Sequence, residues 1–219
     1  MMRSKHFLTA FLLMLPIMTY GQDGKDGLFL DLGLAYNKVG SGFNGENVLV
    51  SVDDVFAVPK FDAGIGFGVA MGYRYSGLYV ELAYQRTTHD IDLSGVGGEA
   101  VHSMWSFTIR RLFLKEYRLQ PFIQLGWVPL MPIRAKESAL LVSQNRISDA
   151  IFIGDIANFT AGGGLEFALR PNMAIRLSAM YKRARYVSVE SSEENVAISL
   201  EEAINADDVN VTLGVIFVL

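Results

Sequence analysis

Two charged residues, Glu166 and Arg176, lie within apolar and small residues on either side of an Arg170-Pro171-Asn172 turn, in the stretch GGGLEFALRPNMAIRLSAMY. A buried charge is costly unless it is paired. In a hairpin with a three-residue loop and a left-handed Asn172, Glu166 falls directly opposite Arg176. A five-residue loop makes the two side chains diagonal neighbours. Either loop predicts an ion pair, in which each of the two residues compensates the buried charge of the other.

The histidines and serines form no catalytic arrangement that the sequence reveals. His102 and Ser103 are adjacent on a predicted strand, so their side chains point to opposite faces and do not form a Ser-His pair. His89 precedes Asp90 and could serve as a general base or lie solvated in a loop. The Gly162–Gly164 run lacks the strand-loop-helix context and the Lys-Ser/Thr pair of a phosphate loop. We therefore expect no enzyme and no cofactor.

Acidic residues gather in the segments predicted as long loops. They include Asp53, Asp54, Glu190, Glu193, Glu194, Glu201, Glu202, Asp207 and Asp208. Carboxylates suit hard divalent ions, although solvated loop charges are the simpler interpretation. The chain has no cysteine, so it has neither a disulfide framework nor a thiolate metal site. We predict no metal site.

Residues 1–21 have the three-part pattern of a secretory signal peptide. Arg3 and Lys5 precede an apolar run from Phe7 to Met18, and small residues stand three places and one place before a cut after Gly21. Loss of Arg3 and Lys5 changes the formal charge from -4 to -6, which leaves no basic surface for nucleic acid. The remaining residues, 22–219, have the size of one domain.

Alternation of apolar with small or polar residues recurs along the chain and predicts β-strands. In GLFLDLGLAYN the even positions are apolar or aromatic, whereas the odd positions include Asp31 and Gly33. Hydrophobic residues make up 51% of the chain, but no segment after the signal peptide is an apolar run long enough for a membrane helix. Eight strands are predicted, at 27–37, 61–76, 78–87, 101–114, 119–130, 156–169, 173–186 and 208–219. This even number predicts an all-β fold, a closed antiparallel eight-stranded transmembrane β-barrel.

The connections between these strands alternate in length. Short ones are predicted at Ser76-Gly77, Lys115–Arg118 and Arg170–Asn172, and long ones at about 38–60, 90–100, 131–155 and 187–207. This alternation is typical of the short periplasmic turns and long extracellular loops of an outer-membrane barrel. Aromatic residues also form two sets: Tyr36, Tyr84, Trp105, Trp127, Phe159 and Tyr181 near the loop end, and Tyr73, Tyr75, Phe113, Phe167 and Phe217 near the turn end. Two such girdles are expected where a barrel meets the two membrane interfaces.

The inward positions of the predicted strands collect charged residues into one network. Its members are Asp31, Arg74, Glu81, Arg110, Glu166, Arg176 and Lys182. Glu81 falls diagonal to Arg74, within side-chain reach. An eight-stranded barrel is just wide enough for side chains to fill it, which favours a packed polar lumen. The alternative is that these charges line a narrow ion path.

Several motifs resemble those of the small eight-stranded outer-membrane β-barrel family, which includes the membrane domain of outer membrane protein A and short porin-like barrel proteins. They are Gly64, Gly66 and Gly68 of one strand, LQPFIQLGW at 119–127, GGGLEFALRPNMAIRLSAMYKR at 162–183, and the final VNVTLGVIFVL. The resemblance implies the barrel fold for residues 22–219. It also implies that the last strand, with Phe217 and Leu219, is recognised by the barrel assembly machinery.

We therefore expect an exported, monomeric integral outer-membrane protein with a structural or surface-interaction role, in contact with outer-membrane lipid and lipopolysaccharide. Two alternatives stay open: a narrow porin or channel for small solutes, and a soluble periplasmic barrel that binds an apolar ligand and has its apolar parity inside. Local helix is predicted at 137–149. At 192–206 the pattern fits either a helix or a strand extension of the barrel.

Overall fold

The computed structural model describes residues 26–219 except 41, 44–46, 52–53, 94–95, 143–144 and 192–196. The signal peptide predicted at 1–21 lies outside the described residues. The elements are β1 (Gly27–Lys38), β2 (Asn47–Ser51), β3 (Asp54–Ala57), β4 (Lys60–Phe61), β5 (Gly64–Tyr75), β6 (Leu78–Leu93), β7 (Val96–Leu112), β8 (Leu119–Leu130), β9 (Pro132–Val142), β10 (Asn145–Gly154), β11 (Asn158–Arg170), β12 (Met173–Ser191) and β13 (Ala197–Val218). Among the described residues, no helix is long and apolar enough to cross a membrane.

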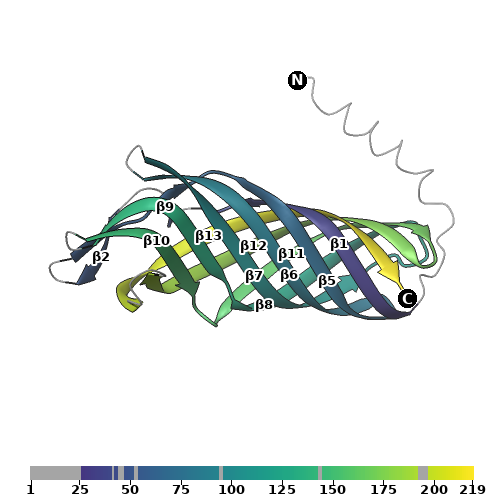
Figure 1. Cartoon of the computed structure of the whole chain (residues 1–219). Coiled ribbons are helices and arrows are strands. Elements are labelled where there is room, and N and C mark those ends of the chain that lie inside the picture. The colour runs from purple at the N-terminus through teal and green to yellow at the C-terminus, as the bar shows by residue number, and fades with distance from the viewer. Residues whose placement is uncertain are drawn as a thin grey trace, which may run out of the picture.

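Eight of these strands form a closed ring in which every neighbouring pair is antiparallel (Figure 1). The pairings run from β1 through β5, β6, β7, β8, β11 and β12 to β13, and β13 pairs with β1 again. The predicted eight-stranded β-barrel is therefore confirmed. Closure pairs the edge strands with each other, so no open sheet edge is left around the ring.

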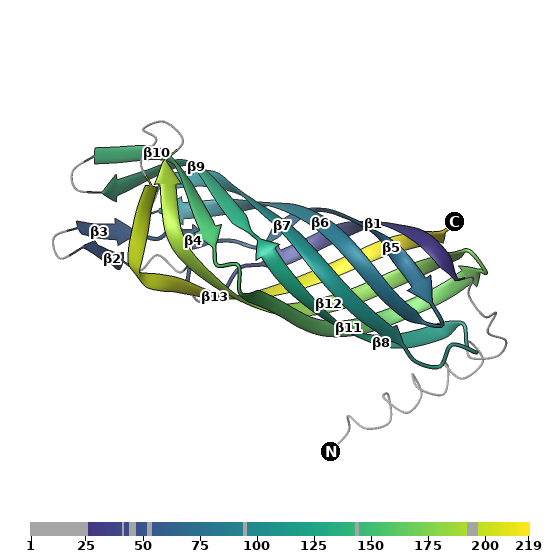
Figure 2. The same cartoon turned by 90° about the horizontal axis from the view of Figure 1, so that it is seen from below.

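The barrel wall continues beyond the predicted strands at the loop end, where β9 and β10 add a further hairpin (Figure 2). β9 pairs with the upper part of β7 and β10 with the upper part of β12, so the hairpin fills the gap above β8 and β11. The helix predicted at 137–149 is therefore wrong for the described residues there, which are in strands. Beyond the ends of β8 and β11, the edges of β7 and β12 would have unpaired backbone groups. Pairing with these edges outweighed the local helix propensity of β9 and β10.

The same extension changes two predicted loops. β6 and β7 pair up to Leu93 and Val96, so most of the loop predicted at 90–100 is strand. Of the two options for 192–206, the described part from Ala197 onward is strand, in register with β12. The barrel thus stands taller at the loop end than the sequence predicted.

Two of the three predicted short connections have informative backbones. Ser76 and Gly77 have φ values of 49° and 76°, as the predicted primed turn requires. At the other hairpin, Glu166 lies opposite Arg176 in the predicted register. This register is reached through an irregularity between Ala168 and Arg170. Asn172 is not among the described residues with positive φ, so the left-handed Asn172 of the three-residue option is wrong.

The outer face of the barrel carries a continuous apolar belt, which we define by its exposed large side chains. They include Leu28, Leu34, Tyr36, Ile65, Phe67, Met71, Tyr73, Val80, Trp105, Ile109, Ile123, Leu125, Trp127, Phe159, Leu177, Tyr181, Leu213 and Phe217. Leu34 and Ile65 are 71% and 73% exposed, whereas the alternate position Asp31 is 1% exposed. The alternative with the apolar parity inside is therefore not the arrangement found in this part of the barrel.

Candidate functional site in the barrel lumen

Six of the seven charged residues predicted to face the lumen meet in its turn-end half. Asp31, Arg74, Glu81, Arg110, Glu166 and Arg176 come from six different strands of the ring, and each is less than 10% exposed. β13 contributes the small residue Gly214 at the same level. A Cβ atom on Gly214 would lie 2.5 Å from Asp31 Oδ1, so the glycine leaves the space that this carboxylate occupies.

The ion pairs join these side chains into one chain of alternating charge. Arg110 is central, with Nη2 2.8 Å from Glu81 Oε2 and Nη1 3.5 Å from Glu166 Oε2. On one side Glu166 Oε1 lies 3.7 Å from Arg74 Nη1. On the other side Arg176 lies 3.7 Å from Glu81 and 2.7 Å from Asp31. We call this set the charge chain; its three acids and three bases balance.

The predicted pair of Glu166 with Arg176 does not form in this chain, although the two residues are opposite in register. Glu166 instead pairs with arginines of β5 and β7, and Arg176 pairs with carboxylates of β1 and β6. Glu81 likewise pairs with Arg110 and Arg176, and no described ion pair joins it to Arg74. The lumen is narrow enough for long side chains to reach across it, so a carboxylate can contact two guanidinium groups from non-adjacent strands.

An aromatic cluster supports the charge chain from the turn end, and the sequence analysis did not identify it. Tyr79 Oη donates a hydrogen bond of 2.8 Å to Glu166 Oε1. The Arg110 guanidinium lies over the Tyr79 ring at 4.1 Å and near the Phe122 ring at 5.2 Å. Phe29, Tyr79, Leu112, Phe122, Ala174, Ile216 and Val218 form one buried apolar cluster. The alternation of β6 could have identified Tyr79, because Tyr79 lies two residues before Glu81 and so faces the lumen like Glu81.

Lys182, the seventh predicted residue, lies apart from the charge chain. Its Nζ is 2.5 Å from Asp208 Oδ2 and donates to His102 Nε2 at 3.3 Å. Asp208, counted above among the loop acids, is fully buried. Its place on the inward parity of β13, with Asn210 and Thr212, was the signal that could have identified it.

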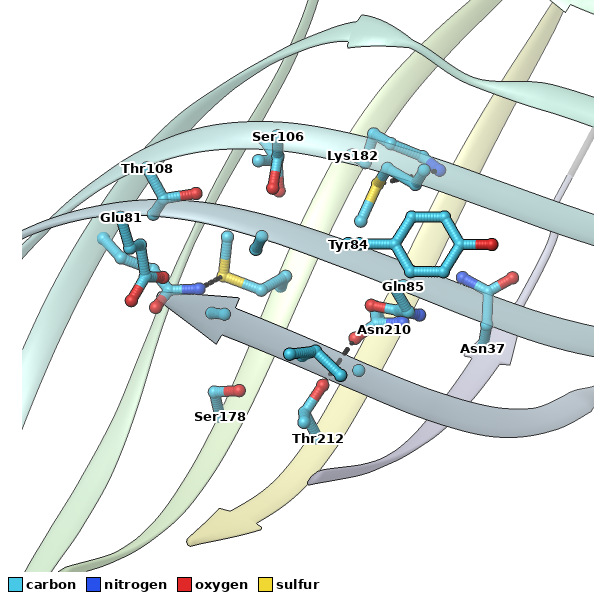
Figure 3. Close-up of a pocket in the computed structure, with 18 of the residues that line it drawn as sticks. Asn37, Glu81, Tyr84, Gln85, Ser106, Thr108, Ser178, Lys182, Asn210 and Thr212 are labelled. Carbon is cyan, nitrogen blue, oxygen red and sulfur yellow. Dashed lines mark hydrogen bonds between the residues drawn. The ribbon is translucent and has the colours of Figure 1, made fainter. Parts of the chain in front are cut away.

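A cavity of about 70 Å³ lies between the charge chain and Lys182 (Figure 3). Hydroxyl and amide side chains of the surrounding strands point into it, among them Ser106, Thr108, Ser178, Asn210 and Thr212. Asn37 Oδ1, Gln124 Oε1 and Asn210 Nδ2 are buried here without a hydrogen-bond partner among the described residues. A polar space of this size has room for several water molecules.

The loop end of the lumen is closed by apolar side chains, including residues of the first long loop. Phe43 packs edge-to-face on Phe61, Phe152 and Tyr186, with ring centroids 4.8 to 5.1 Å apart. Val39 and Val58 belong to the same buried cluster, which we call the loop-end plug. The plug lies between the polar cavity and the loop end of the barrel.

The two histidines among the described residues, His89 and His102, lie at the lower boundary of the plug. His89 is 1% exposed, contacts the Phe61 ring, and hydrogen-bonds with the Thr87 hydroxyl and the Asp62 carbonyl, so it is not the solvated loop residue considered above. His102 is buried, whereas Ser103 lies on the other face, as predicted. Among the described residues, no three His, Cys, Asp or Glu side chains are grouped so as to hold a metal ion.

Comparison with known proteins rests on structure, because no protein-family model and no curated protein matches the sequence. Neisserial surface protein A superposes with a TM-score of 0.52 at 14% identity, over 88% of this chain and 97% of that one. The outer membrane protein OprG from Pseudomonas aeruginosa superposes with a TM-score of 0.51 at 12% identity, over 90% and 97%. The outer membrane protease OmpT from Escherichia coli also matches, with a TM-score of 0.45 at 8% identity, over 89% and 97%. The chain has the fold of the small eight-stranded outer-membrane β-barrels.

Proposed function

We propose that this protein is an integral outer-membrane barrel whose lumen is packed, and that its role is structural or one of surface interaction. The observation that carries the proposal is the opposite composition of the two faces of the same strands. Leu32 and Leu34 on β1 are exposed on the outside, whereas Asp31, the residue directly before Leu32, is buried in an ion-paired lumen. An apolar surface of this extent marks an interaction surface, and its continuation around the barrel supports a membrane as the partner.

The height of the apolar belt supports membrane insertion. On β13 the outward residues from Val209 to Leu219 are apolar. Ten steps of about 3.3 Å give about 33 Å along the strand, or about 25 Å along the barrel axis at a tilt of about 40°. This matches the apolar band of outer-membrane barrels. Exposed aromatic residues also lie at both ends of the belt, for example Trp105 and Trp127 at the loop end.

The two closures of the lumen favour a role other than transport. The charge chain and its aromatic cluster close the turn end, and the loop-end plug closes the other. The second candidate function, a narrow channel for small solutes, is favoured by one observation, the polar cavity between the two closures.

Single-channel recording in a planar bilayer distinguishes the two candidates. The packed-lumen proposal expects a silent bilayer after insertion, with heat-modifiable migration on a gel showing that the barrel is folded. Steady large openings of the folded protein would instead establish the channel. Recovery of the protein in the soluble periplasm would contradict membrane insertion itself.

We also propose that the protein is not an enzyme. The charged groups of the charge chain are paired with one another and buried. His102 and Ser103 face opposite sides of their strand, which excludes a catalytic pair between them. For its partners we propose outer-membrane lipid and lipopolysaccharide, and the barrel assembly machinery through β13, with the protein itself a monomer.

A further inference from the structure

A groove of about 300 Å³ lies on the outer wall of the barrel, immediately beyond the loop-end limit of the apolar belt. Its floor is on β7, with Val101 and Ser103, and Arg86 of β6 and Arg134 of β9 stand on either side. The two flanking strands are two strand spacings apart, which is about 10 Å. The groove is therefore open sideways, along the surface of the barrel.

The strand registers fix the height of this groove relative to the belt. Tyr84 pairs with Trp105, and these two residues mark the loop-end aromatic girdle. Two residues farther along each strand, Arg86 pairs with Ser103. In a membrane-inserted barrel, a side chain one row above the girdle lies at the level of the lipid headgroups.

The groove has an excess of positive charge on the side that faces the belt. Arg86 and Arg134 are exposed, and within the described part of the chain neither takes part in an ion pair. Lys136, one row higher, lies opposite Glu99, so these two opposite charges offset each other. The two arginines are left as the uncompensated charges of the groove.

The rim of the groove away from the belt is acidic. Glu99 is paired in register with Asp90 of β6, and both side chains are exposed. With Lys136 offsetting Glu99, this row keeps one net negative charge, that of Asp90, which an anion arriving from the external solution must pass. The predicted mature chain is itself negative. An anion that arrives in the plane of the membrane meets Arg86 and Arg134 first. This charge distribution favours a membrane-borne anion over a soluble one.

We propose that this groove binds the phosphate group of a phosphorylated glycolipid of the outer leaflet. Arg86 and Arg134 donate to the phosphate oxygens, because the planar guanidinium group matches phosphate geometry. The Ser103 hydroxyl faces the same groove, and the acyl chains of the lipid continue downward over Tyr84 and Trp105. The inference rests on the proposed membrane insertion and names the place where one lipid is held.

The test measures binding of diphosphorylated lipid A to the full barrel in nanodiscs of neutral phosphatidylcholine. The wild-type protein is compared with an Arg86→Gln/Arg134→Gln double variant. At about 1 kcal/mol for each arginine near a charged headgroup, the double variant should bind about 30-fold more weakly. Dephosphorylated lipid A should bind the wild-type protein no more tightly than it binds the double variant.

A matched control removes two charges at a similar height on another part of the wall. Arg183 and Arg185 of β12 are exposed beyond Tyr181, and Arg183 lies opposite Asp207. The Arg183→Gln/Arg185→Gln variant should keep wild-type binding of lipid A. An equal loss in this control would show general charge attraction and overturn the assigned groove.

Two further results separate this inference from the proposal on which it rests. If inorganic phosphate competed for the groove as effectively as lipid A in the nanodisc experiment, the assignment to a lipid would be overturned. Heat-modifiable migration and flotation with phosphatidylcholine vesicles that lack lipid A test folding and insertion alone. A double variant that inserts normally and still binds lipid A like the wild-type protein would contradict the inference and leave the proposed function intact.

Discussion

The belt half and the loop-end half of this barrel use the same strands and the same inward parity with opposite side-chain chemistry. On β12, Arg176, Ser178 and Lys182 face the lumen in the belt half, and Leu177 and Tyr181 face outward. Farther along the same strand, the inward residues Ala184 and Tyr186 are apolar, and the outward residues Arg183 and Arg185 are charged. Between Lys182 and Ala184 the hydrophobic face changes sides with no irregularity in the pairing of β12 with β13.

β13 changes in the same way at the same height. Ile204 and Ala206 are buried in the loop-end plug, whereas Asp208 and Asn210 are buried beside the polar cavity. Backbone pairing therefore fixes which side chains point inward, and the belt half and the loop-end half fill these inward positions with opposite chemistry. In the belt half, the outward side chains are apolar and the lumen side chains are polar. Beyond the belt, the barrel has an apolar core like that of an ordinary water-soluble protein.

The largest expected effect comes from breaking the charge chain in the belt half. Arg110→Met leaves Glu81 and Glu166 facing each other in a closed lumen without their central partner. Removing one partner of a buried ion pair costs about 3–5 kcal/mol, so the free energy of unfolding should fall by that amount. Urea unfolding of the barrel in phospholipid vesicles, followed by tryptophan fluorescence, measures it.

A balanced double variant serves as the control for this prediction. Arg74 and Glu166 form the end of the charge chain, so Arg74→Met/Glu166→Gln removes one charge of each sign and leaves Arg110 paired with Glu81. This double variant should lose less stability than Glu166→Gln alone, which strands Arg74. Equal losses would mean that water solvates these charges and that the lumen is not packed.

A smaller effect is expected from a single methyl group in the same half. In Gly214→Ala the new Cβ atom would meet Asp31 Oδ1 at 2.5 Å, so the charge chain must shift, at a cost of about 1–3 kcal/mol. Gly68→Ala is the matched control, because its nearest neighbour would be the Tyr84 carbonyl oxygen at 3.8 Å and the side chain would enter the polar cavity. Equal unfolding midpoints for the two variants would show that the lumen adapts freely around Asp31.

The sequence predicted the belt half better than the loop-end half. Alternation over Leu28–Tyr36 and over 61–75 was sufficient for the strands, the ring and the inward parity, because one rule of composition holds throughout the belt. Beyond the belt the rule reverses. A reader who expects polar residues inside and apolar residues outside therefore loses the alternation after Lys182 on β12 and before Asp208 on β13. The adjacent charges Lys182-Arg183 and Asp207-Asp208 stand where the reversal occurs, since one member of each pair faces in and the other faces out.

The partners within the lumen could not be predicted from parity alone. Register places Glu166 beside Arg176, but side-chain length and the curvature of the wall decide that Glu166 contacts Arg74 and Arg110 across the lumen. The plug is a similar case. Phe43 lies in a long loop without periodicity, and only its packing on Phe152 and Tyr186 shows that it returns into the barrel.

The smallest expected effect lies at the boundary between the halves, beyond the belt, where His89 and His102 face Lys182 and Asp208 beneath the plug. Burial lowers the pKa of His89, and burial together with the nearby Lys182 ammonium lowers the pKa of His102. Both groups are therefore neutral in the folded barrel near neutral pH. Their contribution to stability is full above the unfolded pKa of 6.5 and is lost as pH falls from there through the folded values.

Acidification should therefore loosen the loop-end half before the belt half, because protonation adds positive charge beside Lys182 under the apolar side chains of the plug. Hydrogen exchange of β9 and β10 amides, compared with β1 and β5 amides as pH is lowered below 6.5, measures the difference between the halves. The His89→Gln/His102→Gln variant lacks both titrating groups and should lose most of this difference. If wild type and variant respond alike, the two histidines do not set the acid sensitivity of the loop-end half.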